Sequence, residues 1–587
     1  MTATQEPTAV VGAGESAGSA LAARPRWLVP QRIGEDEQKL LGADSLLLAQ
    51  LLWNRGIRSA GEAQAFLNPC TSVALSDPRR MRGVPEATAR LLRAVQSHER
   101  IAIYGDYDVD GVAGAAVLVD ALTGLGADLL VHLPHRARDG YGVNAAAVRE
   151  LAERGATVMV TVDCGITAVD EVQLAGSLGM DVIVTDHHTV PVRLPAGTAV
   201  VNPHQMGCDY PYKDLGGGGV AFQVARALLQ AALPEEEVRQ REGRLAGLAA
   251  LSTVADIVPL TGENRTIVAL GLGAIHAGLI PGVAALCDHA GRRMESLTAQ
   301  DLAFTVIPRL NAAGRMGDAR DALDVLVAPD LESARETAAR LEGANGARRE
   351  RVRELLLAVE EEATHSACEG VLVLAGDYPV GLAGLIAARL AERFGVPCIV
   401  IEQGEETSRG SARGVEGVHL VRALEACASS LIQFGGHEAA AGFTLRSENI
   451  PAFREQLREA VRAARGDTPI EPVLPADGGL RLRSIGPRLA DVLDRFEPVG
   501  AGNPPPAFVS RGTIVRRAQQ LDNGHVRFRL AQGDAVCRGI AFGPDFPVPE
   551  PDTRIDVLYE VERTTWRGEM RVELLIRDAH PSEPASP

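Results

Sequence analysis

The sequence places three aspartates in alternation directly after a β-branched run. Asp106, Asp108 and Asp110 stand in GDYDVDG (105–111), which follows the run IAIY. Three carboxylates this close repel one another, and on an exposed segment they would simply be solvated. The motif begins like the EF-hand loop D-x-D-x-D-G, but that loop needs a glutamate at its twelfth position, which here is Val117. A calcium loop is therefore not expected.

Further oxygen and imidazole donors occur in the motifs VDCG, DHH and ADIVPL, namely Asp163, Asp186, His187, His188 and Asp256. This mixture suits Mn²⁺ or Mg²⁺ better than thiolate-bound zinc. Two such ions about 3.5–4 Å apart can share one carboxylate and clamp the attacking and leaving oxygens of a phosphoryl displacement. Any one motif alone could be structural, for example an aspartate that caps a helix. Together they predict a metal-dependent phosphoryl-transfer site.

Short strands must position these motifs. Residues 101–104, 158–162 and 182–185 are β-branched runs, and amphipathic helical stretches at 112–125 and 145–154 lie between them. Alternating strands and helices predict an open parallel sheet, in which ligands bind beyond the carboxyl ends of the strands. The acidic and histidine motifs all fall at those ends, so we expect them to converge.

The remaining chain predicts a connector, a second α/β lobe and a barrel. An Arg- and Glu-rich helical stretch at 331–363 precedes a smaller strand, helix, strand pattern at 371–402. After residue 472, Pro and Gly clusters and alternating strands are typical of a small antiparallel barrel. We expect a mainly α/β protein with two lobes joined by a long helix and followed by the barrel. The expected divisions are a partly mobile leader 1–40, a catalytic lobe 41–330, a connecting helix 331–365, a second lobe 366–470 and the barrel 471–587.

Composition predicts an ordinary globular protein of the cytoplasm. The 587 residues are 46% hydrophobic and 23% charged, which excludes a disordered chain. The eight cysteines form no CxxC pair, so neither a zinc ribbon nor a dense disulfide framework is expected. The N-terminus lacks a signal-peptide pattern. The uncharged stretch 266–287 contains His276 and Pro281 and is interpreted as buried helix and turn, so we expect no membrane span.

The net charge of −17, taken on its own, argues against a nucleic-acid partner. The charge is unevenly distributed, because residues 471–587 carry 15 Arg against 17 Asp and Glu. Most of the negative charge therefore lies in the two lobes, where bound divalent ions would offset part of it.

The motifs, taken in order, resemble a known family. YGDYDVDG (104–111), VDCG (162–165), DHH (186–188) and ADIVPL (255–260) resemble the DHH phosphoesterase superfamily, and GGHEAAAGF (435–443) resembles its DHH-associated domain. With NAAGRM (311–316) and the added barrel, the chain is similar to the single-strand-specific 5′ to 3′ exonucleases of the RecJ type. That resemblance implies an OB-fold for the barrel.

The resemblance also implies site residues. Two divalent cations, with Mn²⁺ preferred or Mg²⁺ accepted, would be held by Asp108, Asp110, Asp163, His187 and Asp256, with Asp163 bridging. Asp106 and His188 would be the catalytic side chains beside the ions, with His188 orienting or protonating the phosphate. Related enzymes have a histidine at the position of Tyr104, which leaves the coordination of the first ion open.

Contacts to DNA phosphates are expected from arginines and a Gly-flanked loop. In RGSARG (409–414) the glycines would let backbone N–H groups approach an anion. The alternative for each arginine is a salt bridge in an acidic protein. The run 216–219 is interpreted as a hinge or tight turn rather than a phosphate cradle. The candidate DNA and phosphate contacts are Arg136, Arg309, Asn311, Arg315, Ser411, Arg413 and His437.

The sequence thus predicts a metal-dependent exonuclease that takes single-stranded DNA by its 5′ end and releases mononucleotides in DNA recombination and repair. A helicase and a single-strand-binding protein are the expected partners of a monomer that acts in the bacterial cytosol, at the nucleoid during repair. Two alternatives stay open. One is a DHH phosphodiesterase for oligoribonucleotides or cyclic dinucleotides, and the other is a non-catalytic scaffold that binds single-stranded DNA.

Overall fold

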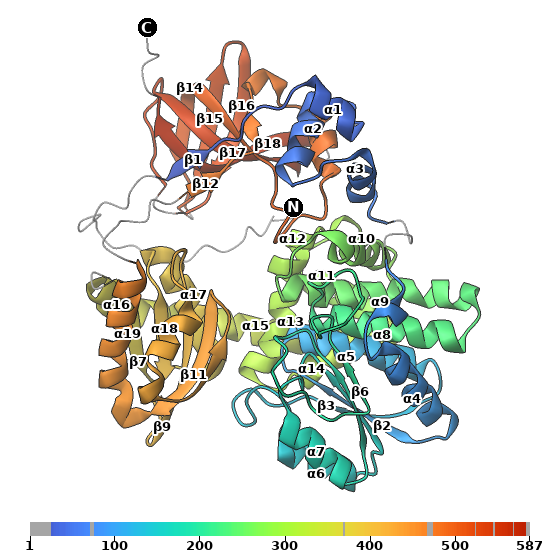
Figure 1. Ribbon diagram of the computed structural model, residues 1–587. Helices are drawn as coiled ribbons and strands as arrows, with labels where there is room; N and C mark the ends of the chain where they lie inside the picture. Colours follow the sequence, from blue (N-terminus) through green and yellow to red (C-terminus); the bar gives the residue numbers. More distant parts are fainter. Residues whose placement is uncertain are drawn as a thin grey trace.

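The computed structural model describes residues 25–582 except 71–74, 368–369, 466–472, 523, 544–545 and 567–568. Two α/β lobes lie side by side, and a β-barrel sits above them (Figure 1). The mixed α/β class with a barrel is confirmed. The expected leader falls largely in residues 1–24, outside the described range.

The first lobe is built on a parallel sheet with strand order β3-β2-β4-β5-β6. Strands β2, β4 and β5 are buried almost throughout, because helices cover both faces, and this explains their continuous β-branched sequences. The strands are β2 (Arg100–Gly105), β3 (Asp128–His132), β4 (Val158–Val162), β5 (Asp181–Thr185) and β6 (Ala199–Val201). All three strands expected from the sequence are present.

Two helices pack closely beneath the site. A Cβ added to Gly114 on α5 (Val109–Thr123) would lie 3.0 Å from the Cα atom of Gly218 on α8 (Gly217–Ala232), so both glycines permit this approach. A helical layer completes the lobe and leads through α15 toward the second lobe. Its main helices are α4 (Val84–Gln96), α9 (Glu235–Ala255), α10 (Gly262–His276), α11 (Pro281–Ala290), α13 (Ile307–Met316), α14 (Arg320–Val327) and α15 (Leu331–Ala358).

Within the described part of the chain, no single helix has the length and apolar character needed to span a membrane. Helices α10 and α11 meet that test only as a pair, and they are bent by 76° relative to each other. Most of their residues are buried in the core of the first lobe, as expected for the uncharged stretch 266–287.

The second lobe follows the short helix α16 (Glu360–Ala367) and has a five-stranded sheet of order β10-β11-β9-β8-β7. Helix α17 (Val380–Phe394) coincides with the helix expected from the sequence. Only β7 and β8 are parallel; the other pairings are antiparallel. The strands are β7 (Leu372–Gly376), β8 (Cys398–Glu402), β9 (Thr407–Arg413), β10 (Leu431–Gly436) and β11 (Ala440–Arg446). Helix α18 (Leu420–Ala426) lies between β9 and β10, and α19 (Ile450–Arg465) comes after β11.

The barrel has the strand order of an OB-fold, since β14-β15-β16-β18-β17 closes by pairing β14 with β17. One pairing, β16 with β18, is parallel, so the barrel is not purely antiparallel. The strands are β14 (Ala507–Gln520), β15 (Val526–Gln532), β16 (Ala535–Ala541), β17 (Arg554–Trp566) and β18 (Glu569–Pro581).

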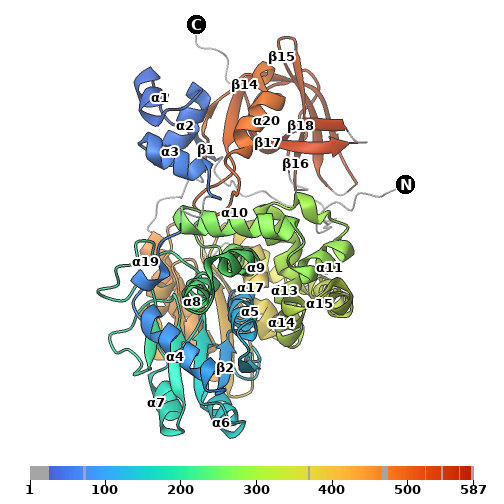
Figure 2. The same ribbon diagram turned by 90° about the vertical axis from the view of Figure 1, so that its right-hand side faces the viewer.

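The N-terminal helices belong with the barrel and not with the first lobe. Strand β1 (Arg26–Leu28) pairs in parallel with β12 (Val473–Pro475), and Figures 1 and 2 show the following helices beside the barrel. Leu48 and Leu52 share one hydrophobic core with Phe496 and Phe528. The first residues of the expected lobe 41–330 therefore lie with the barrel in the structure, because β1 pairs with β12 beside the barrel. These helices are α1 (Glu35–Leu41), α2 (Leu46–Asn54) and α3 (Ala60–Leu67).

Candidate metal centre and phosphate site

The sheet brings the acidic and histidine motifs to one edge. Asp106 follows β2, Asp163 follows β4, and Asp186 to His188 follow β5, all at the carboxyl ends of adjacent parallel strands. Asp163 has a φ of +61°, a left-handed backbone that is uncommon for a residue other than glycine. Strained backbone of this kind clusters at functional sites, and here it lies at the centre of the motif group.

Three buried side-chain atoms in this group have no hydrogen-bond partner: Asp106 Oδ1, Asp163 Oδ1 and His187 Nε2. His187 Nε2 lies 3.2 Å from Asp163 Oδ1 and 3.6 Å from an oxygen of each of Asp110 and Asp256. Burial lowers the pKa of His187, so its ring favours the neutral form that ligates metals. Buried donors without protein partners are what a metal ion would satisfy, so this donor set fits divalent cations.

The donors fall into two subsites connected by Asp163, which also forms a third group with His187 and His188. Asp106, Asp108 and Asp163 have ligand atoms within 4.8 Å of one another, and so do Asp110, His187 and Asp256. Asp163 is also the neighbour of His187 in the second subsite. Burial and the surrounding carboxylates raise the pKa of Asp163 well above its ordinary value, and they raise the pKa of Asp256 to about 8. Cations would relieve this repulsion.

The glycine run at 216–219 binds a carboxylate. Gly217 N and Gly218 N at the start of α8 each donate a hydrogen bond of 2.8 Å to Asp110, and the Ser252 hydroxyl donates a third. A Cβ on Gly217 would lie 2.5 Å from the side chain of Asp163, so only glycine fits there. The interpretation of this run as a hinge or turn was wrong: a helix N-terminus orients a candidate ligand here.

Asp186 orients His188. Its carboxylate accepts from the backbone N–H groups of Ile166, His187 and His188, and lies 2.7 Å from His188 Nδ1. Burial alone would lower the pKa of His188, but the Asp186 carboxylate outweighs it and raises the pKa to about 9. The two adjacent histidines thus differ: His187 faces the carboxylates as a neutral donor, and His188 is a cation suited to a phosphate oxygen.

Two tyrosines border the centre. The sequence left the effect of Tyr104 on metal coordination open and did not single out Tyr141. The Tyr104 hydroxyl donates to the Gly142 carbonyl and accepts from the Asn144 amide, so it fixes a loop and leaves coordination to the carboxylates. The Tyr141 hydroxyl lies 3.3 Å from the Asp163 carbonyl and 3.2 Å from His188 Nδ1. No sequence motif marks Tyr141.

Three arginines gather beside the metal centre without carboxylate partners among the described residues. Burial and the charges of Arg136 and Arg413 lower the pKa of Arg315 to about 9, and burial and Arg136 also lower the pKa of Arg413. Arg136 stacks 3.9 Å from the Tyr107 ring, and Arg413 Nη1 lies 3.2 Å from Ser411 Oγ. Like charges held together in a buried place indicate an anion site.

The remaining candidates have different surroundings. Arg309 pairs with Glu342 and donates to the Thr305 carbonyl, so its charge is neutralised and it does not join the arginine cluster. Asn311 accepts from Val109 N in the metal-binding loop. The His437 ring, from the second lobe, lies 6.3 Å from the His188 ring. The expectation of a phosphate contact is thus not met by Arg309, whereas His437 does lie at the junction of the lobes.

Comparison with known proteins agrees with this geometry. Three family models match in order: the DHH family N-terminal domain at 100–253, the DHHA1 domain at 369–463 and the RecJ OB domain at 476–578. The single-stranded-DNA-specific exonuclease RecJ of Bacillus subtilis is 34% identical over 96% of this chain and 72% of its own. This chain belongs to the RecJ family. The RecJ of Dickeya dadantii is 35% identical over 92% of this chain and 97% of its own.

The solved RecJ structures share the fold. The crystal structure of RecJ in complex with Mn²⁺ from Thermus thermophilus has a TM-score of 0.82 and 30% identity, covering 96% of this chain and 81% of that one. A Mg²⁺ complex from the same organism has a TM-score of 0.76. Both RecJ structures hold the kind of cation that the donor set fits here.

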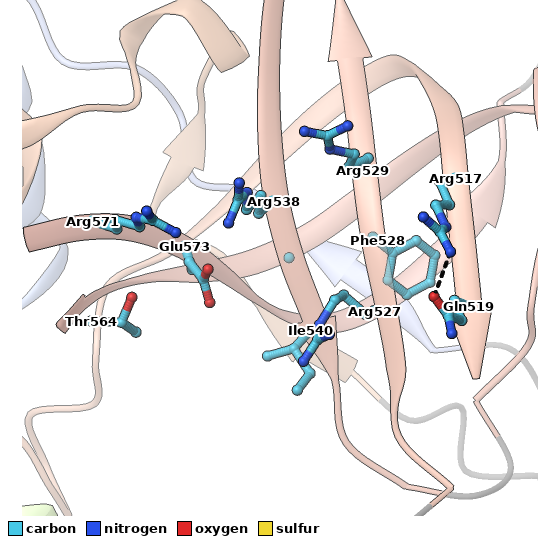
Figure 3. Close-up of a pocket in the computed structure, with 11 residues that line it drawn as sticks. Arg517, Gln519, Arg527, Phe528, Arg529, Arg538, Ile540, Thr564, Arg571 and Glu573 are labelled. Carbon is cyan, nitrogen blue, oxygen red and sulfur yellow. Dashed lines mark hydrogen bonds between the residues drawn. The ribbon is translucent and has the colours of Figure 1, made fainter. Parts of the chain in front are cut away.

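The OB barrel adds a second cationic surface to this RecJ chain. Arg517, Arg529 and Arg538 lie directly opposite one another on β14, β15 and β16, around a groove of about 360 Å³ (Figure 3). Like charges in cross-strand positions destabilise a sheet, so an anion would stabilise this one. Phe496, Phe508 and Tyr559 are buried in the core, and Phe528, which lines the groove, is only 1% exposed.

Proposed function

We propose that this chain is a metal-dependent exonuclease specific for single-stranded DNA, which starts at a 5′ end, releases mononucleotides and acts in DNA recombination and repair. The observation that carries the proposal is the proximity of two sites of opposite charge. One is the carboxylate and histidine centre of the first lobe, and the other is an arginine cluster at the junction with the second lobe that has no carboxylate partner among the described residues. The family membership gives the substrate class.

The proposed ligands follow the two subsites. Asp106, Asp108 and Asp163 would hold one divalent ion, and Asp110, His187 and Asp256 the other. When bound, two such ions supply Lewis acidity that activates water and neutralises charge on the phosphodiester. Mn²⁺ is the preferred ion of this proposal and Mg²⁺ the alternative.

The protein's own residues position the strand. Arg136, Arg315 and Arg413, with the Ser411 hydroxyl, would bind the 5′-terminal phosphate, since none of these arginines pairs with a carboxylate among the described residues. His188, held by Asp186, donates a hydrogen bond to a phosphate oxygen beside Asp163. Asn311 on α13 and His437 from the second lobe would contact the strand beside these arginines.

The decisive assay uses purified protein, Mn²⁺ and single-stranded DNA labelled at either end. We expect labelled mononucleotide at once from a 5′ label, and progressive shortening of a 3′-labelled strand. Release of the 3′ label first would overturn the polarity. Cleavage of short oligoribonucleotides or cyclic dinucleotides but not of long DNA would favour the phosphodiesterase, and binding without product would favour the scaffold.

The proposal extends to the protein's setting. An enzyme that admits only single strands needs a source of unwound DNA, so we propose a helicase and a single-strand-binding protein as partners of a monomer in the bacterial cytosol. Pull-down of these two protein classes with the tagged chain, in nuclease-treated extract, checks the partners. Light scattering checks the monomer.

A further inference from the structure

Phe304 is a large apolar side chain that the fold leaves in solvent, with 81% of its surface exposed. It lies in the π-helical turn η4 (Leu302–Val306), between α12 (Ala299–Asp301) and α13. Its neighbours Leu302, Thr305 and Val306 are buried, so the turn packs firmly and presents Phe304 outward. π-helical turns are rare and are often found at functional sites.

On one side of Phe304, helix α13 leads to the arginine cluster. Pro308, Asn311 and Arg315 follow Phe304 at spacings of four, three and four residues, so they lie along one side of the helix. These three residues are partly accessible, whereas Leu310 and residues 312–314 are buried. At 1.5 Å per residue, Arg315 lies about 16 Å from Phe304 along the helix.

On the other side, the turn approaches the barrel groove. Asp301, at the end of α12, is close enough to Glu562 on β17 to raise the pKa of that carboxyl beyond the effect of its burial. Glu562 pairs across the strands with Glu573, which lines the groove. Figure 1 also shows α12 directly below the barrel. Phe304 therefore lies between the arginine cluster and the barrel, whose groove carries Arg517, Arg529 and Arg538 together with Glu573.

We propose that Phe304 is a stacking platform for an unpaired base of the substrate, a few nucleotides inside the strand from its 5′ end. This inference rests on the proposed function. An aromatic ring between two phosphate-binding regions matches the way proteins hold single strands without reading sequence, because every base has a π-face. A base within a duplex is already paired and stacked on its neighbours, so the platform also selects single strands.

The first test measures binding apart from cleavage, in the Asp163→Ala background. We expect Phe304→Ala to weaken the binding of a long single strand about 5- to 100-fold. The control is Leu178→Ala, which removes an exposed apolar side chain at the opposite edge of the sheet, just before β5. Equal affinities for the two variants would overturn the proposal.

A second test locates the base. Single abasic sites are placed at successive positions from the 5′ end. At one position, the abasic site should weaken binding to the protein that retains Phe304 but not to Phe304→Ala. In Phe304→Trp, the added tryptophan fluorescence should be quenched by the normal strand and less by the strand abasic at that position. An unchanged abasic profile together with unquenched fluorescence would contradict the platform.

A third measurement separates this inference from the proposed function. In protein with intact Asp163, the ratio of long-strand to dinucleotide cleavage should fall in Phe304→Ala and stay constant in Leu178→Ala. If unsubstituted protein cleaves no single-stranded DNA, the proposed function fails. If it cleaves and the ratio does not change, only the role of Phe304 fails.

Discussion

Asp163 Oδ1 lies 3.2 Å from His187 Nε2, and both atoms are buried without a hydrogen-bond partner. Burial disfavours the charged form of both side chains, so it raises the pKa of Asp163 and lowers the pKa of His187. A buried polar atom without a hydrogen bond costs free energy, and one cation between Asp163 Oδ1 and His187 Nε2 would satisfy both atoms. The arrangement is therefore organised for a ligand before the ligand binds.

The first prediction concerns the shared carboxylate. Asp163→Ala should lower the rate of single-strand cleavage by at least about 1,000-fold, equivalent to about 4 kcal/mol of transition-state stabilisation. Weak DNA binding should remain, since the arginine cluster is intact. Asp128→Asn, which removes a carboxylate at the opposite edge of the sheet, is the control. Mn²⁺-dependent cleavage that survives in Asp163→Ala would refute the bridging role.

The second prediction is a pH-dependent stabilisation by metal. The pKa of Asp256 rises from the ordinary 3.8 to about 8 in the folded protein, so folding retains a proton that the unfolded chain releases. In metal-free protein this group therefore lowers the free energy of unfolding as the pH rises from about 4 to about 8. Mn²⁺ replaces the proton and removes that loss.

Thermal unfolding with EDTA or Mn²⁺, from pH 5 to pH 8.5, measures this effect. The increase in Tm caused by Mn²⁺ should grow with pH, and Asp256→Asn should reduce the growth. An increment that is the same at every pH would show that protons and metal do not compete at this group.

The sequence predicted well those elements whose residues are buried on both sides. Strands β2, β4 and β5 are short β-branched runs, and each is followed by its acidic or histidine motif, so their convergence at one edge follows from parallel-sheet geometry. Helix α17 was recognisable for a similar reason, because its buried residues recur at helical spacing.

Features that depend on distant partners were not predictable. Gly217 binds Asp110 from 107 positions along the chain, and the pairing of β1 with β12 joins residues 26–28 to residues 473–475. Arg309 was expected as a phosphate contact, with a salt bridge as the alternative, and its partner Glu342 lies on another helix. Periodicity describes an element's own face and carries no information on which remote side chain meets it.

The third prediction tests the glycine cradle. Gly217→Ala places a methyl group 2.5 Å from Asp163, so Mn²⁺ should no longer raise the Tm and cleavage should fall by at least about 100-fold. Gly219→Ala is the matched control, since its Cβ would make only an ordinary 3.4 Å contact with Leu215. Alanine favours helix by about 1 kcal/mol over glycine, so the control should fold at least as well. Equal activity of the two variants would contradict the cradle.

The fourth prediction concerns the charge of His188. Asp186→Asn removes the partner that raises the pKa of His188 to about 9, so the ring should lose its proton at lower pH. The ratio of kcat/KM at pH 8.5 to that at pH 6 should then fall several-fold relative to the unsubstituted protein. Asp181→Asn, at the start of the same strand, is the control. A pH profile that does not change on Asp186→Asn would show that His188 acts without its charge.

The last prediction addresses how the barrel is fixed to the first lobe. Arg265 on α10 is only 2% exposed, and its guanidinium donates to the backbone carbonyls of Phe66, Arg495, Phe496, Glu497 and Pro498. These carbonyls come from α3 and from the segment that leads into the barrel. One side chain thus joins α10, α3 and the segment that leads into the barrel. Burial lowers the pKa of Arg265 to about 10, so the guanidinium is still charged at neutral pH.

Arg265→Met should therefore cost at least about 3 kcal/mol, because it leaves several buried carbonyls without a donor. Arg265→Lys should recover part of the loss, since an ammonium has three donors against five. Arg239→Met, on the exposed face of α9, should change stability by less than about 0.5 kcal/mol. Chemical denaturation measures these differences, and limited proteolysis should show faster cutting at 495–506 in Arg265→Met. If that segment stays protected and stability is unchanged, the barrel is held by its apolar contacts and not by Arg265.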